Sequence, residues 1–244
     1  MPDLSSFPEN GSAVVIGASG GLGRAFAEMI AASGRFATVH ALSRKPAQFG
    51  PTNIRSGHVD ILSEESIQAA LADVEAPRLV IVASGILHDQ ARGPEKSWRA
   101  LNVDWMENVM RINAFGPALV AKHALPKMPR DGKSCFAAIS ARVGSITDNR
   151  LGGWYGYRAS KAALNMLLKT LSVEFARTHA QGCILGLHPG TVDTSLSQPF
   201  QKGVPEDKLF TPAFSANAML SVINANGAEA TGGLFAWDGQ PIPY

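Results

Sequence analysis

Cysteine is scarce in this chain of 244 residues, which contains only Cys135 and Cys183. Both lie in apolar, strand-like runs, and their spacing matches no metal-ligand motif. A disulfide framework and a cysteine metal site are therefore excluded, and we expect two buried, reduced thiols.

Long apolar runs and clusters of one charge are also missing. No run approaches the roughly 20 apolar residues that a membrane-spanning helix needs. Residues 1–10 lack the basic and apolar segments of a signal peptide, so we expect a cytoplasmic protein without a membrane partner. The 22 Lys and Arg residues nearly balance 20 Asp and Glu residues and are scattered, which argues against a nucleic-acid partner.

What the sequence does contain is an alternation of strand and helix patterns from one end to the other. This alternation predicts an α/β fold, namely a Rossmann-type, doubly wound parallel sheet of about seven strands with helices on both faces. The length suits a single domain over residues 1–244. The predicted strands are 13–17, 37–42, one ending at 58–61, 79–83, 135–139, 183–187 and 234–237, and the predicted helices are 22–32, 63–71, about 103–128 and 159–178.

The longest irregular stretch runs from Pro189 to Pro212. Loops of this length are usually functional, so we expect residues 193–212 to cover the substrate. Trp154, Phe200 and Phe210 are candidates for an apolar substrate wall, with ordinary core packing as the alternative.

A glycine-rich loop, Gly-Ala-Ser-Gly-Gly-Leu-Gly, joins the first predicted strand to the first predicted helix. In this context glycines let the backbone approach a pyrophosphate, and the helix N-terminus supplies free N–H groups. The alternative is a tight turn without a ligand. The loop fits both a G-x-x-x-G-x-G and a G-x-x-G-x-x-G spacing, which leaves the type of dinucleotide fold open. The candidate contacts are Gly17, Ser19, Gly20, Gly21, Leu22 and Gly23.

The end of the second strand points to the cofactor. An acidic residue there would bind the ribose 2′-hydroxyl of NAD, but this chain has Ser43 followed by Arg44. A guanidinium suits a 2′-phosphate, so we expect NADP(H) rather than NAD(H), although a solvated Arg-Lys turn is the alternative. Asp60, with Ile61 beside it, is a candidate contact to the adenine ring or a helix cap.

The catalytic candidate is a tyrosine–lysine pair. Of three tyrosines, only Tyr157 has a lysine, Lys161, four residues further on, which places both on one helix face. A free phenol has a pKa of about 10, and we expect the nearby ammonium to favour the phenolate. Tyr157 could then exchange a proton with a carbonyl or alcohol oxygen while a nicotinamide transfers hydride. Surface packing is the alternative role for such a pair.

With these motifs in this order, the chain resembles the short-chain dehydrogenase/reductase family over essentially its whole length. The resemblance rests on the glycine loop, Asp60, Asn113, Tyr157 with Lys161, and Pro189-Gly190. Residues 144–146 and 152–161 resemble the C-factor and sniffer-type carbonyl reductases, and the compact length and the Pro-Gly pair favour the compact branch over the extended one.

The resemblance implies further roles. Asn113 would hold a water in a proton relay with Lys161, and Lys161 would also contact the nicotinamide ribose. Val192 and Thr194 would meet the carboxamide, and a homodimer or homotetramer is implied. The other residues implied to lie against the cofactor are Ala83, Ser84, Gly85, Pro189 and Gly190.

Two departures from the family pattern stand out. The turn after the fourth strand is Val82-Ala83-Ser84-Gly85, without the family's asparagines. The fifth strand is followed by Ser140-Ala141, where the family commonly has two serines and the second orients the substrate oxygen. Ser140 is the favoured substitute, Ser145 is the other candidate, and a third possibility is that the hydroxyl is dispensable.

These features predict an NADP(H)-dependent oxidoreductase that interconverts an aldehyde or ketone and its alcohol, with Tyr157 as general acid and base. Ala141 and the C-factor resemblance leave an alternative open, a nucleotide-binding signalling or regulatory protein with little or no turnover. An epimerase or dehydratase is disfavoured because the chain is too short for the extended branch's substrate domain.

Overall fold

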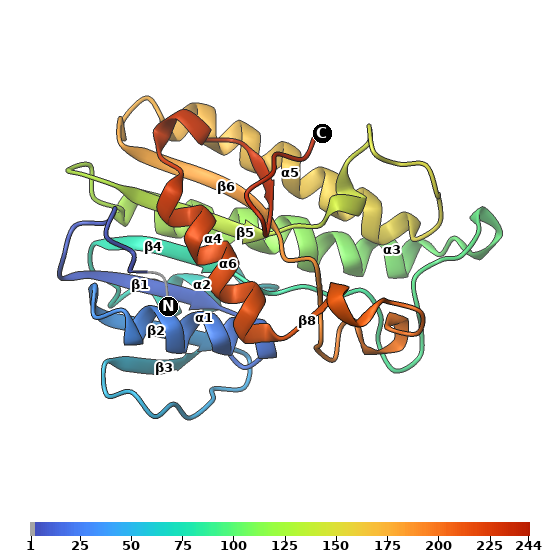
Figure 1. The fold of residues 1–244 in the computed structure, drawn as a ribbon, viewed down its shortest axis with the longest axis horizontal. Coiled ribbons are helices and arrows are strands. Elements are labelled where there is room, and N and C mark those ends of the chain that lie inside the picture. The colour runs from blue at the N-terminus through green and yellow to red at the C-terminus, as the bar shows by residue number, and fades with distance from the viewer. Residues whose placement is uncertain (1–2) are drawn as a thin grey trace.

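The structure is a computed structural model that describes residues 3–244. It is built on a parallel seven-stranded sheet with the order β3-β2-β1-β4-β5-β6-β9 (Figure 1), which confirms the predicted fold class. The strands of this sheet are β1 (Gly11–Ile16), β2 (Phe36–Ser43), β3 (Ile54–His58), β4 (Pro77–Val82), β5 (Ser134–Ile139), β6 (Gly182–His188) and β9 (Leu234–Ala236).

Helices cover both faces of the sheet (Figure 1). Residues of β1 alternate between two cores, with Ala13 and Val15 in one and Val14 and Ile16 in the other. This is why a parallel strand appears in the sequence as a continuous apolar run. One core includes α1 and α6, and the other includes α2, α4 and α5. The helices are α1 (Gly21–Ala32), α2 (Glu64–Leu71), α3 (Val103–Met110), α4 (Gly116–Ala124), α5 (Tyr155–Phe175) and α6 (Pro212–Ala225).

Several boundaries differ from the prediction. The helix predicted over 103–128 is interrupted by a π-helical turn at Arg111–Phe115, between α3 and α4. Helix α5 begins at Tyr155 rather than at residue 159, because Gly152-Gly153 and the left-handed Trp154 end the preceding loop. Helix α6 was not predicted. Its buried residues lie on one face, but apolar residues such as Phe214 also occupy its exposed side, so the sequence lacks the polar face that marks a surface helix.

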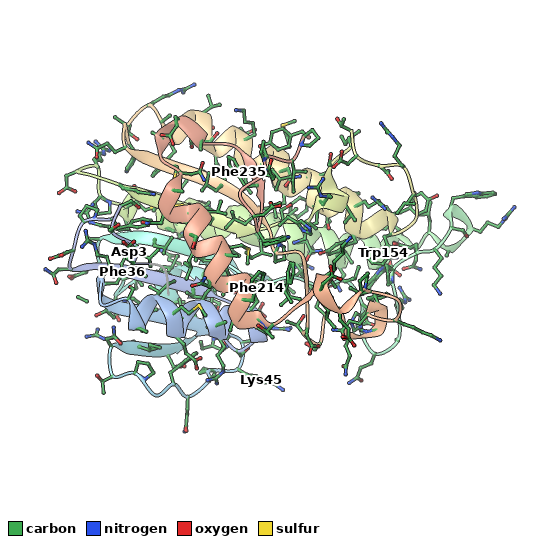
Figure 2. All side chains as sticks on the ribbon, viewed as in Figure 1. Asp3, Phe36, Lys45, Trp154, Phe214 and Phe235 are labelled. Atoms are coloured by element: carbon green, nitrogen blue, oxygen red, sulfur yellow. The ribbon has the colours of Figure 1, made fainter. Side chains whose placement is uncertain are left out.

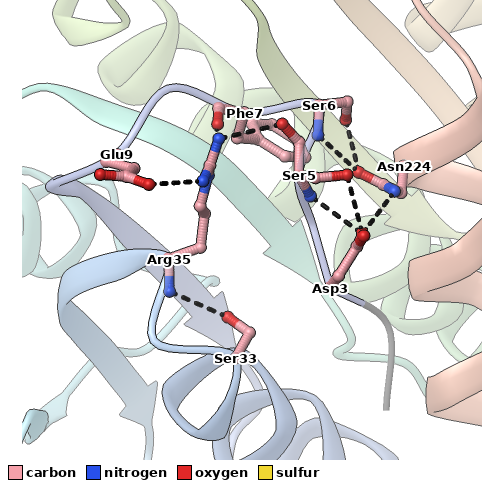
Figure 3. A network of polar contacts seen from close by, with 8 residues as sticks. All are labelled: Asp3, Ser5, Ser6, Phe7, Glu9, Ser33, Arg35 and Asn224. Atoms are coloured by element: carbon pink, nitrogen blue, oxygen red, sulfur yellow. Dashed lines mark hydrogen bonds and ion pairs between the residues drawn. The ribbon is translucent and has the colours of Figure 1, made fainter.

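The segment before β1 is tied to the far end of α6 (Figure 3). Asn224 accepts hydrogen bonds from Ser6 and donates one to Asp3. Arg35 donates to the main-chain oxygens of Ser5 and Phe7. These contacts hold the amino edge of the sheet, which is the edge away from the loops described next.

The carboxyl ends of parallel strands meet at one edge of the sheet, and the loops that follow β4, β5 and β6 extend beyond that edge (Figure 1). Within the 189–212 stretch, β7 (Thr191–Val192) pairs with β8 (Leu209–Phe210) and brings its two ends together. No helix among residues 3–244 is long and apolar enough to cross a bilayer.

Candidate active site

A cavity of about 370 Å³ lies at the carboxyl edge of the sheet. We call it the carboxyl-edge cavity. Loops far apart in the sequence form its wall. The strand order reverses between β1 and β4, and ligands of such sheets bind at the carboxyl edge beside this point. The predicted residues on the wall are Gly20, Gly21, Leu22, Gly23, Ala83, Ser84, Gly85, Ser140, Tyr157, Lys161, Pro189, Gly190, Val192 and Thr194.

The glycine loop is tight for steric reasons. Gly17 has φ +87°, and a Cβ there would lie 2.9 Å from the main-chain nitrogen of Ser84. A Cβ on Gly23 would overlap the Gly17 carbonyl oxygen, so no side chain fits there. Helix α1 begins at Gly21 without a side-chain cap, which leaves first-turn N–H groups free beside the cavity. Both possible spacings share Gly17 and Gly23, while Ser19 is exposed and off the cavity wall.

Tyr157 and Lys161 both line the cavity, from the first turns of α5. The Lys161 Nζ donates to the main-chain oxygen of Ile139 at 2.8 Å and lies 5.6 Å from the centre of the Tyr157 ring. Burial raises the pKa of Tyr157 to about 12 and lowers the pKa of Lys161 to about 7. The expected lowering of the phenol pKa by the ammonium is therefore wrong for this state, because desolvation of both groups dominates.

The two candidate serines have different surroundings. Ser140 follows β5 on the cavity wall, and its hydroxyl donates to Asn165 Oδ1 at 2.6 Å. Ser145 is buried off the wall and accepts from the Asp148 N–H at 3.1 Å. Ala141 itself faces the cavity. Of the two serines, only Ser140 therefore lines the cavity, and its hydroxyl donates its proton to Asn165.

Asn113 is fully buried in the π-helical turn between α3 and α4. Its side chain accepts from the Ile86 N–H at 2.8 Å and donates to the Ile86 oxygen at 2.8 Å and to Ser160 Oγ at 3.1 Å. It thereby joins the segment after β4 to α5. A Cβ on Gly85 would lie 3.4 Å from Asn113 Oδ1 and 3.7 Å from Lys161 Nζ, so Asn113 sits behind the wall at that point.

The residues predicted to select the cofactor lie outside the cavity wall, near the ends of β2 and β3. Ser43 is buried and its hydroxyl donates to the Lys45 oxygen, whereas Arg44 is exposed. The Gly17 N–H donates to the Leu42 oxygen at 2.8 Å, which places the glycine loop beside the end of β2.

Asp60 makes a local turn in this structure. Its Oδ1 accepts from the Leu62 N–H at 2.9 Å, and the side-chain cap of α2 is Ser63, which accepts from Ser66. The predicted capping role at this helix therefore belongs to Ser63. Ile61 is buried, and a Cβ on Gly116 would lie 2.9 Å from its Cδ1.

The apolar part of the wall includes Trp154 and Phe200, two of the three predicted aromatic candidates, whereas the third, Phe210, is not on the wall and packs on Trp237. Trp154 packs on Phe200 with ring centres 5.1 Å apart and on Tyr157 at 6.2 Å (Trp154 is labelled in Figure 2). Its φ of +52° is left-handed, a conformation that costs a residue with a Cβ about 1–2 kcal/mol. The consecutive Gly152-Gly153 before it is the local feature of the sequence that indicates an unusual backbone here. The other apolar wall residues are Leu87, Ile139, Val143, Leu196 and Val204.

Two further polar residues reach the cavity wall. Arg142 is paired with Asp148 at 2.9 Å and is half exposed. Burial lowers the pKa of His188 to about 4, and its Nδ1 is buried without a hydrogen-bond partner among the described residues. The imidazole is therefore neutral near pH 7.

Comparison with known proteins gives concordant results. A family model described as short chain dehydrogenase matches residues 12–204. The C-signal protein of Myxococcus xanthus is 36% identical over 150 residues, covering 60% of this chain and 85% of that protein. The NADPH-bound carbonyl reductase from chicken fatty liver superposes with a TM-score of 0.84 at 25% identity, covering 97% of this chain and 100% of that one. The carbonyl reductase Sniffer of Drosophila melanogaster shares the fold, with a TM-score of 0.79 at 20% identity, covering 97% of this chain and 100% of that one.

Proposed function

The chain belongs to the short-chain dehydrogenase family, and from this premise we propose that it is an NADP(H)-dependent oxidoreductase that interconverts an aldehyde or ketone and its alcohol. The observation that carries the proposal is one cavity lined by both the start of α1 and the Tyr157–Lys161 pair. A dinucleotide site and a proton donor are thus adjacent, which hydride transfer to a carbonyl requires.

The residues present fit a dinucleotide. Gly17 and Gly23 leave no room for side chains between the glycine loop and its neighbours, and the first turn of α1 has no side-chain cap. Such a helix start binds a pyrophosphate through N–H groups and the helix dipole. The nicotinamide, when bound, would supply or accept hydride. We propose that the glycine loop also contacts the dinucleotide through Ser19, Gly20, Gly21 and Leu22. The proposed contacts outside the loop are Ala83, Ser84, Gly85, Pro189, Gly190, Val192 and Thr194.

Tyr157 is the proposed general acid and base. With its pKa raised to about 12, the phenol is protonated at neutral pH and can donate to a carbonyl oxygen that gains electron density. Lys161 is held by Ile139 next to the phenol, and its pKa of about 7 lets it exchange a proton near neutrality. We propose that Lys161 restores the proton of Tyr157 and that Asn113 supports the arrangement from behind the wall. Ser140, on the wall, is the proposed residue that orients the substrate oxygen, with Ser145 as the other candidate.

We propose NADP(H) rather than NAD(H) because no carboxylate follows β2. Ser43 stands there instead, and the exposed Arg44 is free to pair with a 2′-phosphate. The chicken liver carbonyl reductase, which has a similar structure, is described with NADPH bound. Asp60 and Ile61 are the proposed neighbours of the adenine ring.

On the substrate side, residues 193–212 are the proposed covering loop. Ser195, Leu196, Ser197, Phe200 and Val204 of this loop line the cavity. The loop contacts the segment that follows β4, where His88 Nε2 lies 3.1 Å from the Ser195 oxygen. With Trp154 they form a largely apolar wall, which favours a carbonyl compound with an apolar substituent.

The test is fluorescence titration with NADPH and NADH, followed by NADPH consumption over a panel of aldehydes and ketones. We expect NADPH to bind more tightly than NADH and Arg44→Ala to lose about tenfold in NADPH affinity with little change for NADH. Arg177→Ala, an exposed arginine beyond the end of α5, is the matched control. If neither nucleotide binds, the proposed function is wrong.

A second candidate is a nucleotide-binding signalling protein with little turnover. The similarity to the M. xanthus C-signal protein and the Ala141 replacement favour it. The two candidates differ in one observable, because tight NADPH binding without consumption by any carbonyl supports the second, and consumption supports the first.

We also propose a homodimer or homotetramer. Several large apolar side chains are exposed on α3, on the π-helical turn and on α5, where a second copy could bury them: Val103 at 67%, Phe115 at 51%, Met166 at 66% and Val173 at 52%. Light scattering that gives the mass of a monomer would contradict this assembly.

A further inference from the structure

Glu95 is a buried carboxylate under the first turn of α5 that no step proposed above uses. It lies in the segment between β4 and α3 and is only 4% exposed. Its Oε2 accepts from the Gly156 N–H at 3.1 Å, and its main-chain oxygen accepts from the Trp154 N–H at 2.5 Å. Glu95 therefore contacts the residues on either side of Tyr155, at the start of the helix that carries Tyr157.

Burying this carboxylate is costly without compensation. Within residues 3–244 no cation pairs with Glu95, and its Oε1 has no hydrogen-bond partner. The positive end of α5 is the favourable partner that remains. Helix α5 in turn lacks a side-chain cap of its own, since Trp154 at the cap position makes no such bond. The Glu95 carboxylate thus accepts from the Gly156 N–H at the uncapped helix start, and the positive end of α5 compensates the buried charge.

The contact is also tight. A Cβ on Gly156 would lie 2.9 Å from Glu95 Oε1 and 3.5 Å from Met106 Cγ, so a side chain here would displace the Glu95 carboxylate. Because Glu95 contacts Gly156, the first turn of α5 has little freedom to shift or rotate. Tyr157 is the next residue, and Trp154, which forms part of the apolar wall, is two residues before Gly156.

We propose that Glu95 is a positioning residue for the reaction: it acts through Gly156 and Trp154 to place the Tyr157 phenol and the Trp154 indole at the cavity. This inference rests on the proposed function for its effect on turnover, but not for its effect on the helix start. Small misplacements of reacting groups are expensive, with about a hundredfold loss for a shift of about 1 Å.

The kinetic test compares Glu95→Ala with Glu95→Gln. We expect Glu95→Ala to lower kcat about tenfold while the Kd for NADPH changes less than about twofold, because the groups displaced are the acid and the apolar wall and not the nucleotide site. Glu95→Gln keeps an acceptor for the Gly156 N–H and is expected to return kcat to within about threefold of wild type. Glu174→Ala, an exposed glutamate on the same helix, is the control.

A second measurement does not depend on turnover. Hydrogen exchange of the Gly156 amide is expected to be at least about tenfold faster in Glu95→Ala than in wild type or Glu95→Gln, with the second half of α5 unchanged. If Glu95→Ala does not fold, Glu95→Asp, which withdraws the carboxylate by one methylene, is expected to give the same two effects.

Wild-type kcat and wild-type exchange in Glu95→Ala would each overturn the proposal, and so would a Glu95→Gln variant no better than Glu95→Ala. Should the wild type reduce no carbonyl, the proposed function would fail while the exchange measurement would still decide the role of Glu95.

Discussion

At the scale of single residues, the chemistry depends on how burial changes two titratable groups. Tyr157 and Lys161 lie one helical turn apart, and desolvation pushes both toward their neutral forms. A neutral phenol is a proton donor, which suits the reduction of a carbonyl. A bound nucleotide phosphate or oxyanion would change this balance, so the ligand-free pKa values describe the starting state.

Removing the phenol hydroxyl tests its role directly. We expect Tyr157→Phe to lower kcat by about 10²–10⁴-fold, the usual contribution of a general acid, with NADPH affinity retained. The readout is NADPH consumption with the best carbonyl of the panel, beside a binding titration. Tyr155→Phe, two residues earlier on the same helix, is expected to behave like wild type, and equal losses in the two variants would contradict the assignment.

Lys161 gives a prediction for stability against pH. Its pKa is about 7 when folded and near 10.5 when unfolded, so between these values the unfolded chain binds more protons. The free energy of unfolding of the ligand-free protein is therefore expected to rise from about pH 7 to about pH 9.5. Lys161→Met should remove this part of the rise, as thermal melting across that range would show.

The upper limit of that range is set by Tyr157. Its pKa is raised from 10.0 to about 12, so the stability it contributes is present below pH 10 and is lost as pH rises toward 12. Parallel melting curves for wild type and Lys161→Met between about pH 7 and 9.5 would show that Lys161 is not the titrating group.

At the scale of elements, the glycine loop and α1 act as one unit. Gly23 lies on the first turn of α1 against the carbonyl of Gly17, which has the left-handed backbone of the turn. The close approach of these two main chains fixes the direction from which α1 presents its N–H groups to the cavity.

Gly23→Ala is therefore expected to abolish NADPH binding and to destabilise the fold by about 1–3 kcal/mol, since the methyl group would have to displace main-chain atoms. Gly50→Ala is the matched control, because a Cβ at this exposed glycine would meet no atom within 4 Å. Titration and chemical denaturation of both variants measure the effects. NADPH binding by Gly23→Ala at wild-type strength would show that the loop does not hold the nucleotide.

At the scale of the whole molecule, the edge of the sheet opposite the cavity is stabilised by long-range polar contacts. Lys133, which precedes β5, donates to the main-chain oxygens of Ile223 and Asn224 at the end of α6 and to Ser6 Oγ. Its ammonium also lies 4.9 Å from the centre of the Phe7 ring. One buried side chain thus connects the N-terminal segment, the sheet and α6.

We expect Lys133→Met to lower the free energy of unfolding by about 2 kcal/mol, because it leaves buried carbonyls without a donor. For a chain of this size that corresponds to a Tm lower by about 4–8 °C, without a change in NADPH affinity. Lys169→Met, which alters a lysine on α5, is the control. A fall in NADPH affinity would mean that the two edges of the sheet are coupled.

Much of the fold could be predicted from the sequence because local patterns report it. Buried parallel strands produce apolar runs, and a serine, Ser63, caps α2 at its start. Helix α6 escaped prediction because apolar residues occupy its exposed side as well as its buried face. The π-helical turn at Arg111–Phe115 leaves no pattern of its own, and it buries Asn113 between Ile86 and Ser160.

The sequence by itself determined the glycine loop, the missing acid after β2 and the Tyr157–Lys161 pair, because each depends on residue type and short spacing. Tertiary structure alone decided that Ser140 faces the cavity while Ser145 does not, that Trp154 and Phe200 meet on its wall, and that Glu95 lies under Gly156. These contacts join residues tens of positions apart, and burial in them, rather than spacing, sets the pKa values of Tyr157 and Lys161.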